Sequence, residues 1–195
     1  MIRFAEFIYE SEKFRGVVYH GTDARFDKFD QRKSRIVNDN YGGGVAYFTD
    51  GLNLAITYAK NMAKKSGNDP IVYSVELNFN KLFDVDHEFT GKELIDILPT
   101  DVKDFARGAG LLSINTDEYK VISNLKSGIT KLTGEQIYRG LSKGNTQGSK
   151  ARDYLISKRY DSLRYNINTG SKHSVYLAYN ADDIKIIKRQ VVKQK

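Results

Sequence analysis

The sequence predicts an α+β fold, in which short strands near both ends of the chain enclose a mostly helical middle. Apolar and polar residues alternate over Ile71–Phe79, as in a strand with one buried face. Apolar residues recur at helical spacing from Leu52 to Ala63. Residues 91–147 read as polar helices separated by Gly and Ser, and apolar runs return near the C-terminus. Together these patterns indicate a sheet with a helical insertion.

The expected elements follow one another in a simple order. A glycine loop, 42–44, leads into the second strand, and Asp50 is a candidate N-cap for the helix after it. Lys64 to Gly67 and then Pro70 close that helix. The expected strands and helices are strands at 16–19 and 45–49, a helix at 52–63, strands at 71–79 and 82–85, helices at 92–98, 102–106, 117–125, 134–141 and 151–158, and strands at 160–165, 174–179 and 184–187.

Residues 1–14 are predicted to form a separate amphipathic helix, followed by one domain over 15–195 whose variable helical region spans about 91–147. Phe4, Phe7 and Ile8 make the apolar face of this helix. It is not a secretory signal, because its apolar section is short and is interrupted by Glu6.

Composition excludes several classes of site. The 195 residues include no Cys, which rules out disulfides, a Cys nucleophile and a Cys-based zinc site. The three His residues are widely separated, so we expect no metal centre. No apolar run approaches 18 residues, and we therefore expect a soluble protein without a membrane-spanning helix.

Positive charge is concentrated at the C-terminus. The net charge is +7, and five basic residues and no acid occur from Lys185 to Lys195. Such a face suits the pyrophosphate of a dinucleotide or a nucleic acid, and it is equally consistent with an ordinary solvated surface.

Two tyrosines eleven residues apart, Tyr47 and Tyr58, are the most informative feature of the chain. One lies on the strand after the glycine loop and the other on the following helix, near the edge of its apolar stripe. Two such rings can enclose a flat, positively charged ring, to which aromatic faces are attracted by roughly 0.5–2 kcal/mol. Each tyrosine alone would be read as packing, and only the joint order and spacing with His20 and Gly21 argue for a site.

These residues resemble the motifs of the ADP-ribosyltransferase superfamily, in its His-Tyr-Glu branch of diphtheria-type toxins and poly(ADP-ribose) polymerases. The matching segments are His20-Gly21-Thr22, then Gly44-Val45-Ala46-Tyr47-Phe48-Thr49-Asp50, then Tyr58. The resemblance implies a split β-sandwich that binds NAD as substrate, with no metal. It further implies that Tyr47 and Tyr58 bracket nicotinamide, that Gly21 binds the carboxamide through its backbone, and that His20 holds the adenosine-side ribose.

The resemblance also implies a set of site residues. The catalytic positions are His20, Tyr47, Tyr58 and Val175, and the NAD-contacting positions are His20, Gly21, Thr22, Gly44, Tyr47, Phe48, Ala55 and Tyr58. Ala55 stands where relatives often carry a serine that bonds the carboxamide.

The chain departs from the branch at its third motif residue, a glutamate. Aligning the C-terminal strand puts Val175 at that position, while a shift of one or two residues would place Ser174 or His173 there. None of the three is an acid. The loss argues against poly-ADP-ribose elongation, which needs a carboxylate to activate the incoming hydroxyl. It leaves mono-ADP-ribosyl transfer, or a catalytically silent fold that binds NAD, nucleic acid or a protein partner.

The first ten residues also resemble the capsid-targeting leaders of internal head proteins of T-even-like bacteriophages. Those leaders end in a (Leu/Ile)-x-Glu cleavage site, and Ile8-Tyr9-Glu10 has this form. On this interpretation the chain is a monomeric phage effector, cut after Glu10, carried inside the virion and delivered to the host cytoplasm. Its acceptor would be a host protein or, given the positive charge, RNA or DNA. The other interpretation is a structural N-terminal helix.

Overall fold

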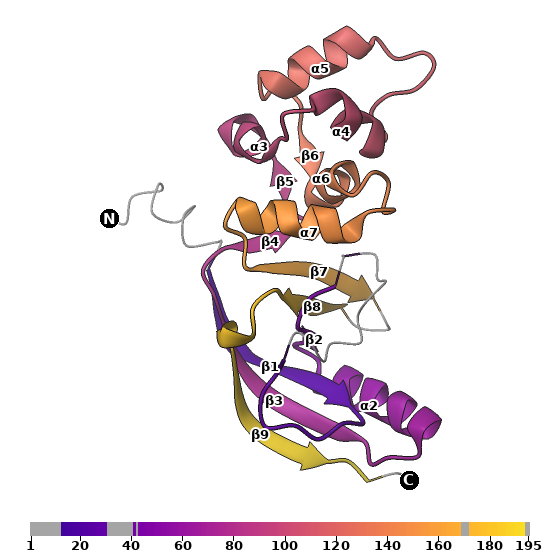
Figure 1. The fold of residues 1–195 in the computed structure, drawn as a ribbon, viewed down its shortest axis with the longest axis vertical. Helices are drawn as coiled ribbons and strands as arrows, with labels where there is room; N and C mark the ends of the chain where they lie inside the picture. Colours follow the sequence, from indigo (N-terminus) through magenta and orange to yellow (C-terminus); the bar gives the residue numbers. More distant parts are fainter. Residues whose placement is uncertain (1–12, 31–40, 42, 169–171, 194–195) are drawn as a thin grey trace, which may run out of the picture. The chain divides into compact units, whose positions relative to one another are not determined.

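The computed structural model describes residues 13–30, 41, 43–168 and 172–193, and it has an α+β fold (Figure 1). Most of the predicted N-terminal helix, with its cleavage site, lies outside the described residues. Phe14, its expected last residue, already belongs to the first strand, so this end of the helix prediction is wrong. The chain divides into two compact units, one from residues 1–36, 44–83 and 160–195 and the other from 37–43 and 84–159.

The first unit carries the sheet. Its described residues form seven strands in the order β4-β7-β8-β2-β1-β3-β9. The bounds are β1 Phe14–Thr22, β2 Ala46–Thr49, β3 Ile71–Phe79, β4 Leu82–Asp84, β7 Ser162–Asn168, β8 Lys172–Ala178 and β9 Ile184–Val191, with a 3-10 turn, η2, at Ala181–Asp183.

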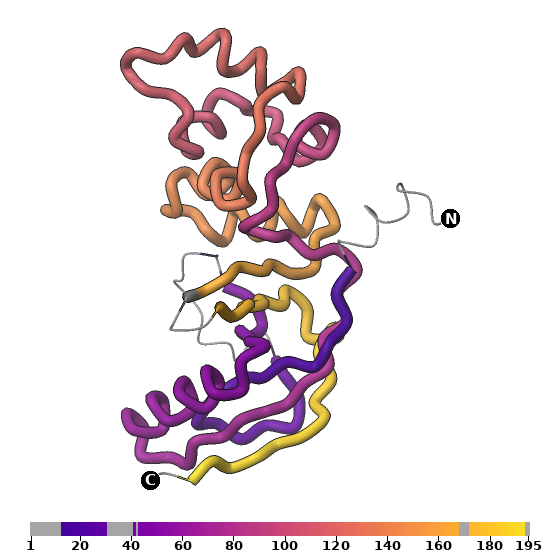
Figure 2. The backbone as a smooth tube through the Cα atoms, turned by 180° about the vertical axis from the view of Figure 1, so that it is seen from behind, coloured from indigo at the N-terminus to yellow at the C-terminus, as the bar shows by residue number. Residues whose placement is uncertain are grey.

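The two halves of the sheet are joined by a short pairing between β1 and β2. Strand β1 pairs with β3 from Phe14↔Phe79 to Thr22↔Ile71, but it pairs with β2 only at Tyr19↔Thr49. In Figure 2, β1, β3 and β9 run side by side as one curved layer. Past Tyr19, the end of β1 therefore has a strand neighbour on one side only among the described residues. The predicted His20 and Gly21 lie in this open stretch.

Helix α2, Leu52–Ser66, packs on β1 through small side chains. Its buried residues, Ala55, Ala59 and Ala63, recur every four positions and so form one face. Gly67 ends the helix in the left-handed conformation, and its N–H bonds the Ala63 carbonyl. Asp50, in contrast, does not cap the helix. The N-cap is Gly51, without a side-chain bond, because the Asp50 carboxylate accepts from the backbone N–H of Ser174 instead.

An aromatic core fills the other face of the sheet around Tyr73. This side chain is fully buried, and its hydroxyl accepts from the Phe26 N–H at 2.9 Å and donates to the Phe26 carbonyl at 3.0 Å. The two rings stack at 4.4 Å. These contacts fix the segment that follows β1 against the sheet, where Phe29 also joins the core.

The second unit is mainly helical. Its elements are α3 Gly91–Ile97, α4 Val102–Gly108, α5 Glu118–Lys126, α6 Gly134–Leu141 and α7 Gly148–Ser157, with a short pair of strands, β5 Glu88–Phe89 and β6 Leu132–Thr133. A capping box between Thr133 and Gln136 starts α6. A mainly helical region is thus present, and its first helix, α3, starts at the expected residue 91, while the compact unit that contains it also includes residues 84–90. The pair β5–β6 was not predicted, since two-residue strands carry no periodic signal.

Candidate functional site

His20 lies on β1 and packs into the aromatic core. Its ring is edge-on to Phe29 at 5.3 Å and lies 5.7 Å from the Phe48 ring. Its Nδ1 is 2.8 Å from the backbone carbonyl oxygen of Tyr47. The first two motif residues, 27 positions apart in the chain, are therefore held together directly.

The partner of His20 sets its tautomer. A carbonyl oxygen only accepts hydrogen bonds, so Nδ1 carries the proton and Nε2 keeps its lone pair. Burial lowers the pKa of His20 from 6.5 to about 4. At neutral pH the ring is uncharged, and Nε2 can accept a hydrogen bond from a hydroxyl group.

This pKa predicts a loss of stability in acid. The unfolded chain binds a proton at His20 below pH 6.5, whereas the folded chain does not until about pH 4. Stability from neutral His20 is therefore complete above pH 6.5 and declines by about 3 kcal/mol as the pH falls to 4. Urea unfolding from pH 8 to 4 should show this decline in the wild type and in the control His87→Phe. It should be much smaller in His20→Phe, and an equal decline there would contradict the assignment.

Gly21 is required by the packing of α2. A Cβ at this position would overlap the backbone carbonyl oxygen of Ala55 and lie 2.9 Å from the backbone nitrogen of Ala59. Strand and helix therefore approach each other backbone to backbone. Ala55 itself is 1% exposed, so its side chain presents almost no surface to a ligand in this structure. Both residues stay predicted NAD contacts.

The other glycine of the motif, Gly44, has a similar packing reason. A Cβ there would lie 2.5 Å from the Ala178 carbonyl oxygen and 2.6 Å from Leu177 Cδ1. The neighbouring motif residues Thr22 and Phe48 are also buried, at 5% and 1% exposure. These three positions shape the site by packing, and any contact that they make with NAD stays a prediction.

The strand register places Tyr47 and Val175 on one face of the sheet. Tyr47 is opposite Leu177, and Thr49 is opposite Val175, which also faces Tyr165 on β7. Directly opposed residues of antiparallel strands project to the same side. Accordingly, the Tyr47 and Tyr165 rings meet edge to face at 6.5 Å. Val175 is 5% exposed, so the third motif position is a buried aliphatic side chain.

The strand register also places Ser174 and His173, the two alternatives for the third motif position, on opposite faces of the sheet. Ser174 projects to the opposite face and bonds Asn166 at 3.0 Å. His173 shares the face of Val175, and its Nδ1 lies 3.3 Å from an Asp50 carboxylate oxygen. A Cβ at Gly51 would come within 2.7 Å of the His173 ring. Asp50 therefore links the start of α2 to β8, a role that its N-cap interpretation missed.

The side chains of Tyr58 and Tyr47 do not contact each other in the structure. It projects from α2 with 53% of its surface exposed, and the rings of the two tyrosines do not contact each other in the described part of the chain. The enclosure of nicotinamide between them stays a prediction.

Two kinds of feature are absent from the described residues. They contain no group of three or more His, Cys, Asp or Glu side chains placed to hold a metal ion. They also include no helix with the length and apolar character needed to span a membrane.

Comparisons with known proteins give limited information. No protein-family model matches the chain, and no curated protein matches it either. Among solved structures, the fold is similar to a chain in the crystal structure of the M. tuberculosis MbcT–MbcA toxin–antitoxin complex, with a TM-score of 0.46 and 10% sequence identity. The match covers 93% of this chain and 86% of that chain. At this level of similarity, it establishes neither family nor activity.

Proposed function

We propose that this chain is a mono-ADP-ribosyltransferase that uses NAD as its substrate. The observation that carries the proposal is the hydrogen bond between His20 Nδ1 and the Tyr47 carbonyl. It joins two motif residues from distant parts of the sequence at the point where β1 runs past the end of its pairing with β2. The motif order and spacing in the sequence and this hydrogen bond support the proposal that the two residues belong to one site.

The proposed roles follow from the chemistry of each group. Neutral His20 accepts a ribose hydroxyl at Nε2. Tyr47 and Tyr58 bind the positively charged nicotinamide ring through their aromatic faces. The bond between nicotinamide and ribose then breaks through an oxocarbenium-like state, and a bond from ribose to the acceptor forms while the acceptor proton leaves to solvent. Positioning and electrostatics supply most of the rate, because no side chain is required as a nucleophile.

The third motif position limits the reaction to a single transfer. Val175 is buried and has no proton-accepting group, so it cannot deprotonate a ribose hydroxyl for chain elongation. A product with one ADP-ribose unit for each acceptor site is expected.

The acceptor is proposed to be a host protein, with RNA or DNA as the other class. The experiment incubates the protein with radiolabelled NAD and host lysate, then divides the product between protease and nuclease treatment. Label that is lost to protease and resistant to nuclease supports a protein acceptor. The reverse pattern supports a nucleic acid, and an unlabelled lysate contradicts transfer.

The alternative function is a catalytically silent fold that binds NAD, nucleic acid or a protein partner. The buried aliphatic Val175 in place of an acid is the observation that favours it. Calorimetric binding of NAD without nicotinamide release, in the presence of host lysate, would support this alternative. Measurable turnover would eliminate it.

Delivery from a phage particle remains part of the proposal. Residues 1–10 would direct the monomeric chain into the virion, and cleavage after Glu10 would leave a protein that acts in the host cytoplasm. The proposed site begins at His20, beyond the leader. Mass spectrometry of purified virions should find a chain that begins at Ser11, and one that begins at Met1 would contradict cleavage.

A further inference from the structure

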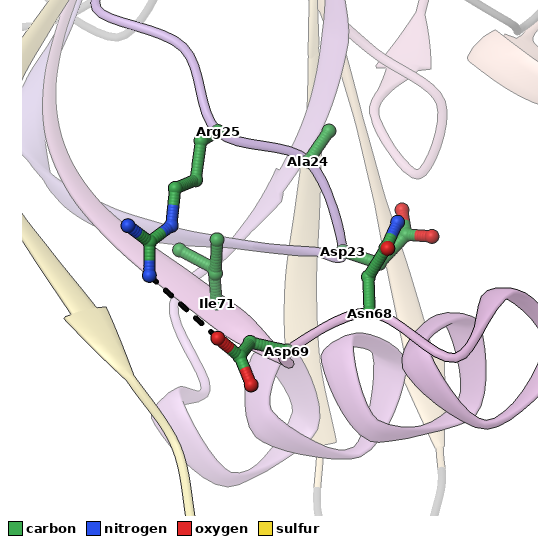
Figure 3. A pocket seen from close by; sticks show the side chains of 6 residues that line it. All are labelled: Asp23, Ala24, Arg25, Asn68, Asp69 and Ile71. Carbon is green, nitrogen blue, oxygen red and sulfur yellow. Dashed lines mark ion pairs between the residues drawn. The ribbon is translucent and has the colours of Figure 1, made fainter.

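Among the described residues, those that line the hollow beyond the end of β1 include no predicted site residue. Figure 3 shows its lining side chains, which lie on the segment after β1 and on the turn and strand after α2. Within it, Arg25 and Asp69 pair with each other at 3.6 Å, and both side chains are more than half exposed. The predicted residues Tyr47 and Val175 lie instead on one face of the paired strands β2 and β8.

On that face, two tyrosine rings meet above strand β8. Strand β8 lies between β2 and β7 in the sheet. Neighbouring strands are about 4.8 Å apart, so the backbones of β2 and β7 are separated by about 10 Å. The rings of Tyr47 on β2 and Tyr165 on β7 nevertheless lie only 6.5 Å apart between their centroids. Both side chains therefore lean inward over β8.

The residues of β8 on this side are aliphatic and buried. Leu177 is directly opposite Tyr47, and Val175 is directly opposite Tyr165. The two aliphatic residues are 0% and 5% exposed. A carboxylate in place of Val175 would be buried against an aromatic ring and would lose its hydration, which is costly. The tyrosine pair thus gives a physical reason for the absence of an acid at the third motif position.

Of the two tyrosines, Tyr165 has the firmer backbone support. It is the middle residue of β7, whose seven residues all pair with β8. Tyr47 lies on β2, which has four residues and pairs with β1 at one position. The two ring planes are 85° apart, an edge-to-face geometry that is favourable for aromatic pairs. Such a contact engages no more than one face of the Tyr47 ring, so Tyr165 leaves at least one face for a ligand.

We propose that Tyr165 is a positioning residue of the NAD site, whose ring holds the Tyr47 ring in the orientation that binds nicotinamide. The proposal rests on the proposed use of NAD and on the proposed role of Tyr47. A tyrosine side chain rotates about two torsions, and fixing them on binding costs entropy. The contact with Tyr165 fixes them before NAD binds, which strengthens binding. The sequence did not single out Tyr165, because no local pattern shows which strand pairs with β7.

A double-mutant cycle on NAD affinity tests the proposal, with calorimetric titration of NAD into the full chain. Tyr165→Leu should raise the Kd for NAD about three- to tenfold, because the Tyr47 ring loses its edge-to-face partner. Tyr47→Leu should raise it at least about tenfold. The double variant should bind NAD no more weakly than Tyr47→Leu, because Tyr165 acts only through the Tyr47 ring.

Two further variants separate ring positioning from general packing. Tyr165→Phe keeps the ring and should recover most of the affinity that Tyr165→Leu loses. Tyr119→Leu makes the same change on α5, where the side chain is 84% exposed, and should keep the wild-type Kd. Thermal melting establishes that each variant is folded. If Tyr165→Leu melts below the assay temperature, Tyr165→Met removes the ring with a more adaptable side chain.

The outcomes distinguish this proposal from the proposed function. Undiminished NAD affinity in folded Tyr165→Leu would overturn the positioning role. Losses that multiply in the double variant would also overturn it, since the two rings would then act independently. Either result would leave the use of NAD and the role of Tyr47 in place. Equal affinity of the wild type and Tyr47→Leu would overturn the role of Tyr47 as well, and a wild type that does not bind NAD would overturn the proposed function itself.

Discussion

Gly21→Ala should destabilise the protein by about 3 kcal/mol or more, or displace α2 from β1. The added methyl group would overlap the Ala55 carbonyl oxygen and press on the Ala59 nitrogen. Both are backbone atoms of one helix, so neither can rotate away as a flexible side chain can. Urea denaturation at pH 7.5 measures the effect, and NAD turnover should fall with it.

Gly16→Ala is the matched control on the same strand. There the new Cβ meets only the ring of Phe14, 3.0 Å away at its nearest atom. That ring can shift, and alanine loses less backbone entropy than glycine on folding, so the variant should stay within about 1 kcal/mol of the wild type. A Gly21→Ala protein as stable as Gly16→Ala would contradict the close packing of β1 against α2.

Tyr58→Ala should lower NAD turnover at least tenfold while leaving stability within about 0.5 kcal/mol. The side chain is 53% exposed, so its removal creates no cavity in the core. If it covers one face of nicotinamide, its loss removes about 2 kcal/mol of attraction to the ring, or roughly thirtyfold in rate. Steady-state kinetics with purified protein, together with thermal melting, separates the two effects.

Tyr119→Ala provides the control for Tyr58→Ala. Tyr119 lies on α5 in the helical unit and is 84% exposed, so the same chemical change is made away from the proposed site. Its turnover should equal that of the wild type. Equal turnover in Tyr58→Ala would remove Tyr58 from the NAD site, and the helix would then carry only a packing role.

Much of the fold can be predicted from the sequence, because the apolar patterns that indicate its strands and helices are local. The alternation of 71–79 and the apolar spacing from Leu52 to Ala63 depend on residues close in the chain, and β3 and α2 lie where these patterns place them. The strand β1 is longer than its apolar run, since its pairing with β3 extends the ladder through Phe14 and Thr22. That extension is a tertiary effect, and no local pattern encodes it.

The candidate site is harder to predict from the sequence, because it depends on the face of the sheet to which each side chain projects. The motif order assigns His20 and Tyr47 to one predicted site, and in the structure His20 Nδ1 lies 2.8 Å from the Tyr47 backbone carbonyl oxygen, a contact that was not predicted. The aromatic cover of Phe26 and Phe29 over the His20 ring was missed. Phe26 and Phe29 are three residues apart just after the strand, and this spacing could have indicated that both rings pack on the same side of the segment. The prediction that Asp50 caps α2 is wrong. An Asp before a helix usually accepts a hydrogen bond from the first turn, but here the backbone N–H of Ser174 on β8 donates to its carboxylate.

The central claim is that His20 belongs to an NAD-cleaving site, and release of nicotinamide from NAD tests it most directly. Purified wild-type protein, His20→Phe and His87→Phe are compared in the presence of host lysate as a source of acceptor. Phenylalanine keeps an aromatic ring among Phe29 and Phe48 but removes the Nδ1 bond to Tyr47 and the Nε2 acceptor. The account predicts nicotinamide release by the wild type and His87→Phe, and a loss of at least about 100-fold in His20→Phe. Equal release by all three folded proteins would contradict it.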